Sequence, residues 1–366
     1  MSKQLLRVFS LLIVFSMILA ACQSTPKAEA YECTDALGCV TVKAGEPITL
    51  AYAMVISGPD ETLGIDSRNG VEIAIGDKGQ VLGHDVTLVG EDDGCSAEGG
   101  QAAGTKLAAN PAIVAVIGTS CSSAARVAVP LLSKAGFTII SASNTAPDLT
   151  EAGNANQHPG YLRTAHNDNV QGAVAAQFAW EYLKVKKAAT IHDGSIYAES
   201  LQRVFAEKFK ELGGEITAQE AVDPNQTDMK SVLTSIATGA PEIIYHPIFV
   251  KAGALIIRQA KETAGLENTF LMGADGMFSP DVMEGAGDAV EGFFVSSPDT
   301  ASFGSDYEAK FLPAYQAKFG TVPISIFHAH AYDAAMMIFA AIEKVAVQDA
   351  DGTLHIPRQA LRDAMY

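Results

Sequence analysis

Residues 112–143, AIVAVIGTSCSSAARVAVPLLSKAGFTIISAS, contain the clearest indication of the fold class. Its apolar run 112–118 is nearly continuous, which is typical of a strand that is covered on both faces of its sheet. Residues 122–135 then have helical spacing, and 137–143 form a second apolar run. A strand, a helix and a strand in this order predict a βαβ unit with parallel strands.

The same alternation continues in both directions along the chain. Because its 366 residues exceed one ordinary domain of roughly 100–200, we predict an α/β protein with two Rossmann-like lobes, whose parallel sheets are flanked by helices. The further predicted strands are 48–56, 86–93, 188–193, 214–222, 242–246, 269–273 and 292–297, and the further predicted helices are 66–78, 97–109, 168–183, 197–212, 228–237, 251–264, 305–319 and 325–346.

The composition excludes two classes of protein. With 48% hydrophobic and 18% charged residues, the chain is not of the disordered type. The net charge is −17, whereas proteins that bind the phosphate backbone need faces rich in Lys and Arg. Aromatic residues make up 7% and include a single Trp, Trp180, which leaves little for stacking on bases. We therefore expect no nucleic acid among the partners.

The amino-terminal segment has the features of an export signal. Lys3 and Arg7 precede a short apolar run, 8–21, and a membrane span needs about 20 apolar residues. The run ends in Leu-Ala-Ala followed by Cys22, which resembles a bacterial lipobox; the alternative is an ordinary cleavage site that happens to precede a cysteine. We expect residues 1–21 to be removed and Cys22 to carry the acyl chains that hold the protein on the outer face of the cytoplasmic membrane, in a periplasm or at the cell exterior.

Four further cysteines follow in the exported chain. They predict two disulfides among three possible pairings. Cys33 and Cys39 enclose only TDALG, so a local disulfide is plausible, and Cys95 would then pair with Cys121. A metal cluster is the weaker alternative, because the spacings are not of the CxxC type. We expect residues 22–46 to contain the acylated cysteine, a polar tether and the small Cys33–Cys39 loop.

Recognised catalytic motifs are absent from the positions where this fold class carries them. The sequence has no GxGxxG after the first strand, no GxxxxGK[ST] and no GxSxG. Residues 24–27 fit SxxK but lie in the tether. His328 and His330 fall two apart on a predicted helix and so cannot share one metal ion. The pair 192–193, His-Asp, is compatible with acid–base work or a polar turn, but no nucleophile follows at a recognised spacing. We therefore predict no enzyme activity, no cofactor and no metal.

Polar loops follow the predicted strands, and parallel α/β sheets bind ligands at the carboxyl ends of their strands. Ser, Thr, Asp and Gly are abundant in these loops, which suits a small polar ligand. The loops are 57–63, 92–95, 119–123, 141–147, 192–197, 247–251 and 273–277.

Seven segments, taken in order, resemble the branched-chain amino-acid-binding proteins of ABC importers, which have the type I periplasmic-binding fold. The segments are SGP (57–59), DDGC (92–95), IGTSCSSA (117–124), SASNTAPDLT (141–150), IHDGSIYAES (191–200), LIIRQA (255–260) and LMGADG (271–276). The resemblance covers roughly 47–345 and implies two lobes joined by a hinge of three crossings, with the ligand enclosed between them. On this basis lobe one is 47–164, lobe two is 165–298, and 299–366 returns to lobe one.

The resemblance assigns the ligand's carboxylate to lobe one. It implies contacts from Ser122 and Thr145 and a backbone contribution at Ser143, and it matches Cys95 and Cys121 to the family's disulfide in this lobe. Taken alone, Ser122 begins a predicted helix, whose positive end attracts anions, but it is equally suited to capping that helix. Thr145 precedes Ala-Pro, where a plain turn residue is the alternative.

The ligand's ammonium group is assigned to the other side of the cleft. The resemblance implies contacts from Tyr197 and from Asp275, which stands where the family has a Glu and is one methylene shorter. Phe249 and Leu63 fall where leucine-binding relatives carry Tyr, and Phe327 matches an aromatic wall; for all three, core packing is the alternative. The loss of two hydroxyl groups predicts a less polar pocket for the ligand's side chain.

These expectations combine into one function. We expect a monomeric protein that captures an apolar amino acid, such as a branched-chain one, by lobe closure and delivers it to the ABC permease of an import system. The alternatives are a ligand sensor or a binder of amides, urea or aromatic acids on the same fold, and a secreted α/β hydrolase is disfavoured because it needs a nucleophile elbow. Residues 356–366 are expected to form a helix opened by Pro357 and cut off without a stop signal, so we expect a carboxyl-terminal truncation.

Overall fold

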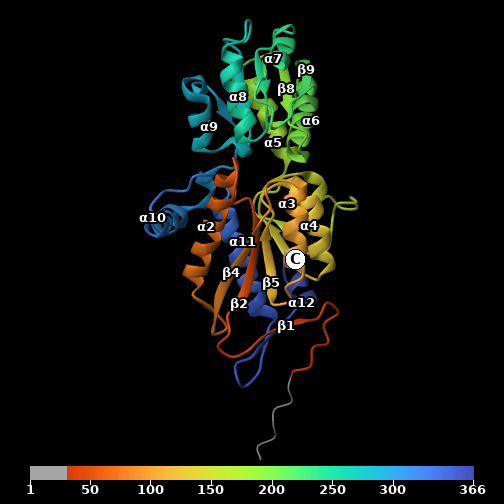
Figure 1. Ribbon diagram of the computed structural model, residues 1–366, viewed down its shortest axis with the longest axis vertical. Helices are drawn as coiled ribbons and strands as arrows, with labels where there is room; N and C mark the ends of the chain where they lie inside the picture. The colour runs from red at the N-terminus through yellow and green to blue at the C-terminus, as the bar shows by residue number, and fades with distance from the viewer. Residues whose placement is uncertain (1–30) are drawn as a thin grey trace, which may run out of the picture.

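A computed structural model describes residues 31–366, so the predicted signal peptide and Cys22 lie outside the described residues. Figure 1 shows two lobes stacked along the long axis of the molecule. Between residues 31 and 366, no helix combines the length and the apolar character that crossing a bilayer requires. The architecture confirms the predicted α/β class, since helices flank two sheets whose strands are mainly parallel.

The first lobe contains a six-stranded sheet with the order β3-β4-β2-β5-β6-β7. Its strands run parallel, except that β3 pairs antiparallel with β4. The strands are β2 (Ile48–Met54), β3 (Gln80–Val81), β4 (His84–Asp92), β5 (Ile113–Gly118), β6 (Thr138–Ser141) and β7 (Tyr161–Arg163), and the helices are α2 (Glu61–Lys78), α3 (Ala97–Ala108), α4 (Ser122–Lys134), α10 (Leu312–Phe319) and α11 (His328–Val345).

Two apolar clusters fill the first lobe, one on each face of this sheet. Helices α2 and α11 pack on one face, in a group that we call the first-lobe core cluster and that includes Leu50, Ile117 and Ile338. Helices α3 and α4 cover the other face, where Leu107 and Val116 are buried. Every residue of β5 is buried, which confirms the two-sided burial predicted from its apolar run.

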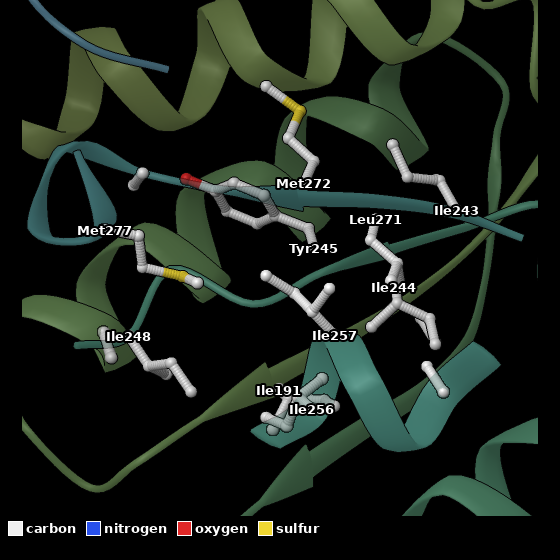
Figure 2. Packing of buried hydrophobic residues seen from close by; sticks show 14 of the residues in the cluster. Ile191, Ile243, Ile244, Tyr245, Ile248, Ile256, Ile257, Leu271, Met272 and Met277 are labelled. Atoms are coloured by element: carbon white, nitrogen blue, oxygen red, sulfur yellow. The ribbon is translucent and has the colours of Figure 1, made fainter. Parts of the chain in front are cut away.

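The second lobe has a five-stranded parallel sheet with the order β12-β11-β10-β8-β9. Figure 2 shows its core, in which Ile243, Ile244 and Tyr245 of the central strand β10 pack among apolar neighbours. The strands are β8 (Lys187–His192), β9 (Glu215–Ala221), β10 (Ile243–Tyr245), β11 (Phe270–Gly273) and β12 (Phe294–Val295), and the helices are α5 (Asp168–Gln177), α6 (Ile196–Glu211), α7 (Lys230–Ala237), α8 (Val250–Lys261) and α9 (Pro280–Ala286).

Short turns complete the two lobes. The 3-10 turns are η1 (Pro147–Leu149), η3 (Asp275–Met277), η4 (Gly287–Val290) and η5 (Thr300–Phe303), and the π-helical turns are η2 (Phe178–Tyr182) and η6 (Tyr307–Phe311). Over residues 31–366 the chain passes between the lobes twice, after β7 and after β12, and not three times as the resemblance implied, because the elements from α10 to α12 all belong to the first lobe. We call these segments the first and second passages.

The end of the chain differs from the prediction. Residues 354–357 form the strand β14 (Leu354–Pro357), which pairs antiparallel with β1 (Cys39–Val42) and β13 (Val347–Gln348), so the last helix, α12 (Arg358–Asp363), begins after Pro357 and ends before 366. The sequence prediction missed this because the pairing joins segments from opposite ends of the chain. The Cys33–Cys39 disulfide beside β1 is confirmed.

Helix α2 begins at Glu61, five residues earlier than the predicted start at 66. The sequence pattern missed the first turn of α2 because that turn contains Gly64. An added Cβ at Gly64 would lie 1.8 Å from the carbonyl oxygen of Val55. Only glycine permits this contact between the first turns of α2 and the preceding strand end. Because glycine has a low helix propensity, the pattern placed the helix start too late.

Gly70 permits a similarly close contact between α2 and α11, since an added Cβ would lie 2.0 Å from the carbonyl oxygen of His328. We expect Gly70→Ala to lower the free energy of unfolding by about 1–3 kcal/mol, because the helices must separate to admit the methyl group. Urea unfolding followed by circular dichroism measures the change.

Gly76→Ala, in the same helix, is the matched control. An added Cβ at Gly76 meets nothing within 4 Å, so the higher helix propensity of Ala should stabilise the protein by about 0.5–1 kcal/mol. Equal unfolding midpoints for the two variants would contradict the close packing of α2 against α11.

Candidate functional site

The lobes contact each other through the loops at the carboxyl ends of their strands. The hydroxyl group of Thr62, in α2, donates a hydrogen bond to the carboxylate of Asp281, in α9. Ile196, at the start of α6, packs against the first-lobe cluster that contains Ala146 and Leu149. The cleft between the lobes is therefore closed in this structure.

Two cavities lie along the junction of the lobes. One, of about 520 Å³, is lined by Pro59 and Thr62 from the first lobe and by Val250 and other residues from the second. The other, of about 290 Å³, lies between Pro147 of the first lobe and Ser200 of the second. Two of the predicted contact residues, Tyr197 and Phe249, directly follow or precede residues that line these cavities, Ile196 and Val250.

Three predicted residues, Ser122, Ser143 and Thr145, lie on the first-lobe side of the junction, and each is at most 8% exposed. Ser122 is the first residue of α4, and its Oγ accepts a hydrogen bond from the backbone N–H of Ala146 at 3.2 Å. Ser143 Oγ donates to the carbonyl of Ser120 at 2.8 Å. The hydroxyl group of Thr145 is buried without a hydrogen-bond partner among the described residues. Its hydroxyl is thus available to a ligand.

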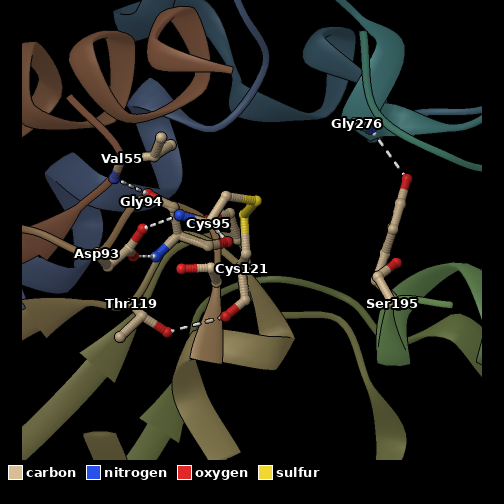
Figure 3. The surroundings of a disulfide bond; sticks show 12 residues. Val55, Asp93, Gly94, Cys95, Thr119, Cys121, Ser195 and Gly276 are labelled. Atoms are coloured by element: carbon tan, nitrogen blue, oxygen red, sulfur yellow. Dashed lines mark hydrogen bonds between the residues drawn. A yellow bond between two sulfur atoms is a disulfide. The ribbon is translucent and has the colours of Figure 1, made fainter. Parts of the chain in front are cut away.

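The Cys95–Cys121 disulfide holds these first-lobe loops together, as Figure 3 shows. Beside it, buried Asp93 accepts hydrogen bonds from the backbone N–H groups of Ser120 at 2.6 Å and Cys95 at 2.9 Å. Burial raises the pKa of Asp93 to about 6. Ser120 Oγ in turn accepts from the backbone N–H of Val55 at 3.1 Å. The disulfide pairing is confirmed, and it braces the start of α4.

Three other predicted residues, Tyr197, Phe249 and Asp275, meet in the second lobe. Asp275 Oδ1 accepts hydrogen bonds from Gln171 Nε2 at 2.6 Å and from Tyr197 Oη at 3.1 Å. Tyr197 Oη accepts from the backbone N–H of Gly276 at 2.9 Å, and the ring centroids of Tyr197 and Phe249 are 5.2 Å apart. Burial raises the pKa of both Asp275 and Tyr197. Tyr197 is held in the first turn of α6, where Ser195 caps the helix by accepting a hydrogen bond from the backbone N–H of Ala198 at 3.2 Å.

The sequence prediction missed Gln171, which joins this group to both passages. Its amide donates to Asp275 and to the carbonyl of Ser296, at 3.0 Å, in the second passage. Its Oε1 lies 2.7 Å from His166 Nε2 in the first passage. The spacing of Asp168 and Gln171, i and i+3 on one helix face directly after a strand end, was the available signal.

Asp168, at the start of α5, was also missed. It is fully buried, and neither of its carboxylate oxygens has a hydrogen-bond partner among the described residues. The hydroxyl groups of Thr145 and Ser200 are near enough to lower its pKa in part, yet neither completes a hydrogen bond with it. Burial has the larger effect and, together with the charge of Asp275, raises the pKa of Asp168 to about 7.

Tyr245, the last residue of β10, belongs to the same surroundings. Its hydroxyl group is buried and has no partner among residues 31–366. Burial raises the pKa of Tyr245, and the charges of Asp275 and Asp168 raise it further. Three chain segments that are distant in sequence thus bring two carboxyl groups and a phenol together.

The structure places the other two predicted residues, Leu63 and Phe327, in core packing. Leu63 is partly buried against the first-lobe core cluster, and Phe327 is a fully buried member of it. The ring of Phe327 stacks on that of His166, with centroids 6.2 Å apart. These contacts correspond to the core-packing alternative.

The groups considered for catalysis and metal binding have structural contacts. His192 Nδ1 accepts from the backbone N–H of Gly194, as expected of a polar turn. His328 Nδ1 lies 2.8 Å from Asp66 Oδ2, inside the first lobe, and burial lowers the pKa of His330 to about 4. In the part of the chain that the structure describes, no group of three His, Cys, Asp or Glu residues could hold a metal ion.

Comparisons with known proteins give one consistent family. The sequence model described as periplasmic binding protein matches residues 47–366. The leucine-, isoleucine-, valine-, threonine- and alanine-binding protein of Pseudomonas aeruginosa is 30% identical over 312 residues, which cover 84% of this chain and 81% of that protein.

Solved structures are similar over most of the chain. A leucine-binding protein from Thermotoga maritima has a TM-score of 0.77 and 25% identity, covering 87% of each chain. A solute-binding protein from R. palustris in complex with benzoate has a TM-score of 0.73 and 21% identity, covering 87% of this chain and 85% of that one. The second match, at this identity, concerns the fold alone.

A substitution at Gln171 tests how the carboxylate of Asp275 is held in place. We expect Gln171→Leu to lower stability by about 1–3 kcal/mol at pH 8, because the buried carboxylate loses a donor. Burial raises the folded-state pKa of Asp275 above its usual value, and the lost hydrogen bond favours the ionised form. The loss should therefore be full above that pKa and shrink as the pH falls through it. Melting temperatures at pH 8 and pH 5 measure it.

Gln202→Leu is the control in the same lobe. The amide of Gln202 donates to the carbonyl oxygen of Glu220, a backbone group that does not titrate. Its loss of stability should be similar at both pH values. The same pH dependence in both variants would contradict an ionised Asp275 as the acceptor.

Proposed function

Because the chain belongs to the periplasmic binding protein family, we propose that it captures the zwitterion of an apolar amino acid between its lobes. The observation that carries the proposal is that two buried groups from different lobes both lie close to Asp168: the unpartnered hydroxyl of Thr145 and the carboxylate of Asp275. One suits a ligand's carboxylate and the other its ammonium group. The binding of several amino acids by the P. aeruginosa relative, as its name states, supports this reading.

On this proposal the first lobe holds the ligand's carboxylate. Ser122 and Thr145 supply hydroxyl groups. Ser122 also lies at the amino-terminal end of α4, where free backbone N–H groups and the helix dipole favour a negative charge. The Cys95–Cys121 disulfide and Asp93 fix these loops before a ligand arrives. Because these loops are already held in place, little conformational entropy is lost when an anion binds to them.

The second lobe holds the ammonium group. A cation taken out of water needs a charge-assisted acceptor, and Asp275 provides one. Gln171 and Tyr197 both donate to the same oxygen of Asp275, which orients the carboxylate. The ring of Phe249 packs on Tyr197 and offers an apolar wall to the ligand's side chain.

Closure converts binding into a signal. The ligand must bind the closed form better than the open one, and here it does so by contacting both lobes at once. The Thr62–Asp281 hydrogen bond joins the two lobes in this closed form. We propose that an ABC permease recognises this closed form, and that the protein works outside the cytoplasm as a lipoprotein anchored through Cys22.

Asp275→Ala tests the assignment of the ammonium group. Removing one partner of a buried charge pair costs about 2–5 kcal/mol, so Kd for leucine should rise by roughly thirtyfold or more. Isothermal titration calorimetry measures Kd, and circular dichroism checks that the fold persists. Asp288→Ala, at an exposed position in the same lobe, should bind as the wild type does. Wild-type affinity in Asp275→Ala would overturn the assignment.

A panel of compounds separates amino acids from other ligands. Leucine, isoleucine, valine, alanine, threonine, benzoate and urea are each added to the protein in a thermal shift assay. At about 100 times Kd a true ligand adds roughly 2.7 kcal/mol, which raises the melting temperature by several degrees. We expect apolar amino acids to do so. Stabilisation by benzoate or urea and by no amino acid would favour the alternative ligand classes, and turnover of any compound would favour an enzyme.

A further inference from the structure

We propose that Asp168 is a second acceptor for the ligand's ammonium group, which it shares with Asp275, so that the site is selective for a primary ammonium. The inference rests on the proposed function, because it concerns the same cleft. It adds a specificity-determining residue that is not among the predicted contacts of the first lobe or of the second lobe.

The first argument is the burial of Asp168 without partners. Its side chain is fully buried, and both carboxylate oxygens lack a hydrogen-bond partner among the described residues. Buried polar groups are almost always paired, and a buried carboxylate without a partner is costly. An ammonium group placed against Asp168 would remove that cost.

The second argument is its position between the lobes. The backbone N–H of Asp168 donates to the carbonyl of Thr145 at 3.0 Å, which places Asp168 beside the first-lobe contact. On the other side it is near Ser200 of α6 and within the electrostatic influence of Asp275. Asp168 therefore lies close to predicted contact residues from both lobes.

The third argument is that the nearby cation is already engaged. Arg163, in β7, donates to the carbonyl oxygens of Asn144 and Ala146 and to the hydroxyl of Thr150. It lowers the pKa of Asp168 only as a minor influence behind burial. The chain therefore leaves the charge of Asp168 to be neutralised by a proton or by a bound cation.

The number of acceptors suggests which cation fits. A primary ammonium has three N–H donors. The junction offers two carboxylates, Asp168 and Asp275, and the hydroxyl oxygen of Thr145, which can accept from the ammonium group while its O–H donates to the ligand's carboxylate. Three donors can thus meet three acceptors, whereas an acid without an amino group would place its apolar atoms beside two carboxyl groups.

A purely structural role for Asp168 makes a different prediction. An acidic residue in the first turn of a helix stabilises the helix through its dipole, while Asn167 supplies the side-chain cap by accepting from Asn169. If that were its whole role, removing the charge would lower stability and leave ligand discrimination unchanged. If it binds the ligand, removing the charge should leave the empty protein as stable or more stable and should weaken amine binding.

The test compares leucine with 4-methylpentanoate, which is leucine without its amino group. Calorimetric titrations are run on the wild type, Asp168→Asn and Asp168→Ser, the last as a small residue suited to a helix start in case Asn misfolds. We expect leucine to bind at least about tenfold more weakly to both variants. Affinity for 4-methylpentanoate should stay the same or improve. Melting temperatures of the empty proteins, at pH 8, should not fall.

Glu98→Gln is the matched control, since Glu98 is an exposed acidic residue in the first turn of α3. It should lose a little stability and bind leucine as the wild type does. Leucine affinity within about twofold of wild type in Asp168→Asn and Asp168→Ser overturns the role of Asp168 and leaves the proposed function standing. Equal weakening of both ligands also overturns it. If the wild type binds no amine of the panel, both the proposed function and this inference fail.

Discussion

The burial of an ionisable carboxyl group between two lobes is the constraint on which the rest of the site depends. Asp275 is almost completely removed from water, so its charge must be met by donors held in place. Gln171 and Tyr197 meet this need, and each is fixed by another part of the chain: Gln171 by the two passages and Tyr197 by its contact with Gly276. The hinge and the second-lobe site are therefore one connected polar network.

Much of the fold followed from local patterns. The apolar run of β5 and the helical spacing of α4 predicted the parallel first-lobe sheet, because strand burial and helix periodicity leave their marks in contiguous residues. The pairing of β1 with β14 could not be predicted from a local pattern, since each strand is short and its partner lies at the other end of the chain. The early start of α2 was hidden by Gly64, whose role is a contact with another segment.

The candidate site was predictable only for residues whose local sequence, in the loop that contains them, indicates their role. Thr145 and Asp275 follow strands and were predicted as ligand contacts through the resemblance to a known family. Asp168 escaped notice because an acid at a helix start is ordinarily a solvated residue that complements the helix dipole. Its burial becomes visible only when Thr145 and Ser200 are placed around it. Phe327 shows the reverse case, since an aromatic residue at a matching position packs in the core.

The small sheet formed by β1, β13 and β14 also has a mechanical meaning. Figure 1 places β1 at the end of the first lobe that is far from the second lobe. Ile356, the partner of Val40 in this sheet, is buried in the first-lobe core cluster, so a pull on the amino-terminal segment is borne by the first lobe alone. On the anchoring and closure proposed above, the anchored first lobe and the moving second lobe are thus separate, so that closure of the cleft does not pull on the anchor.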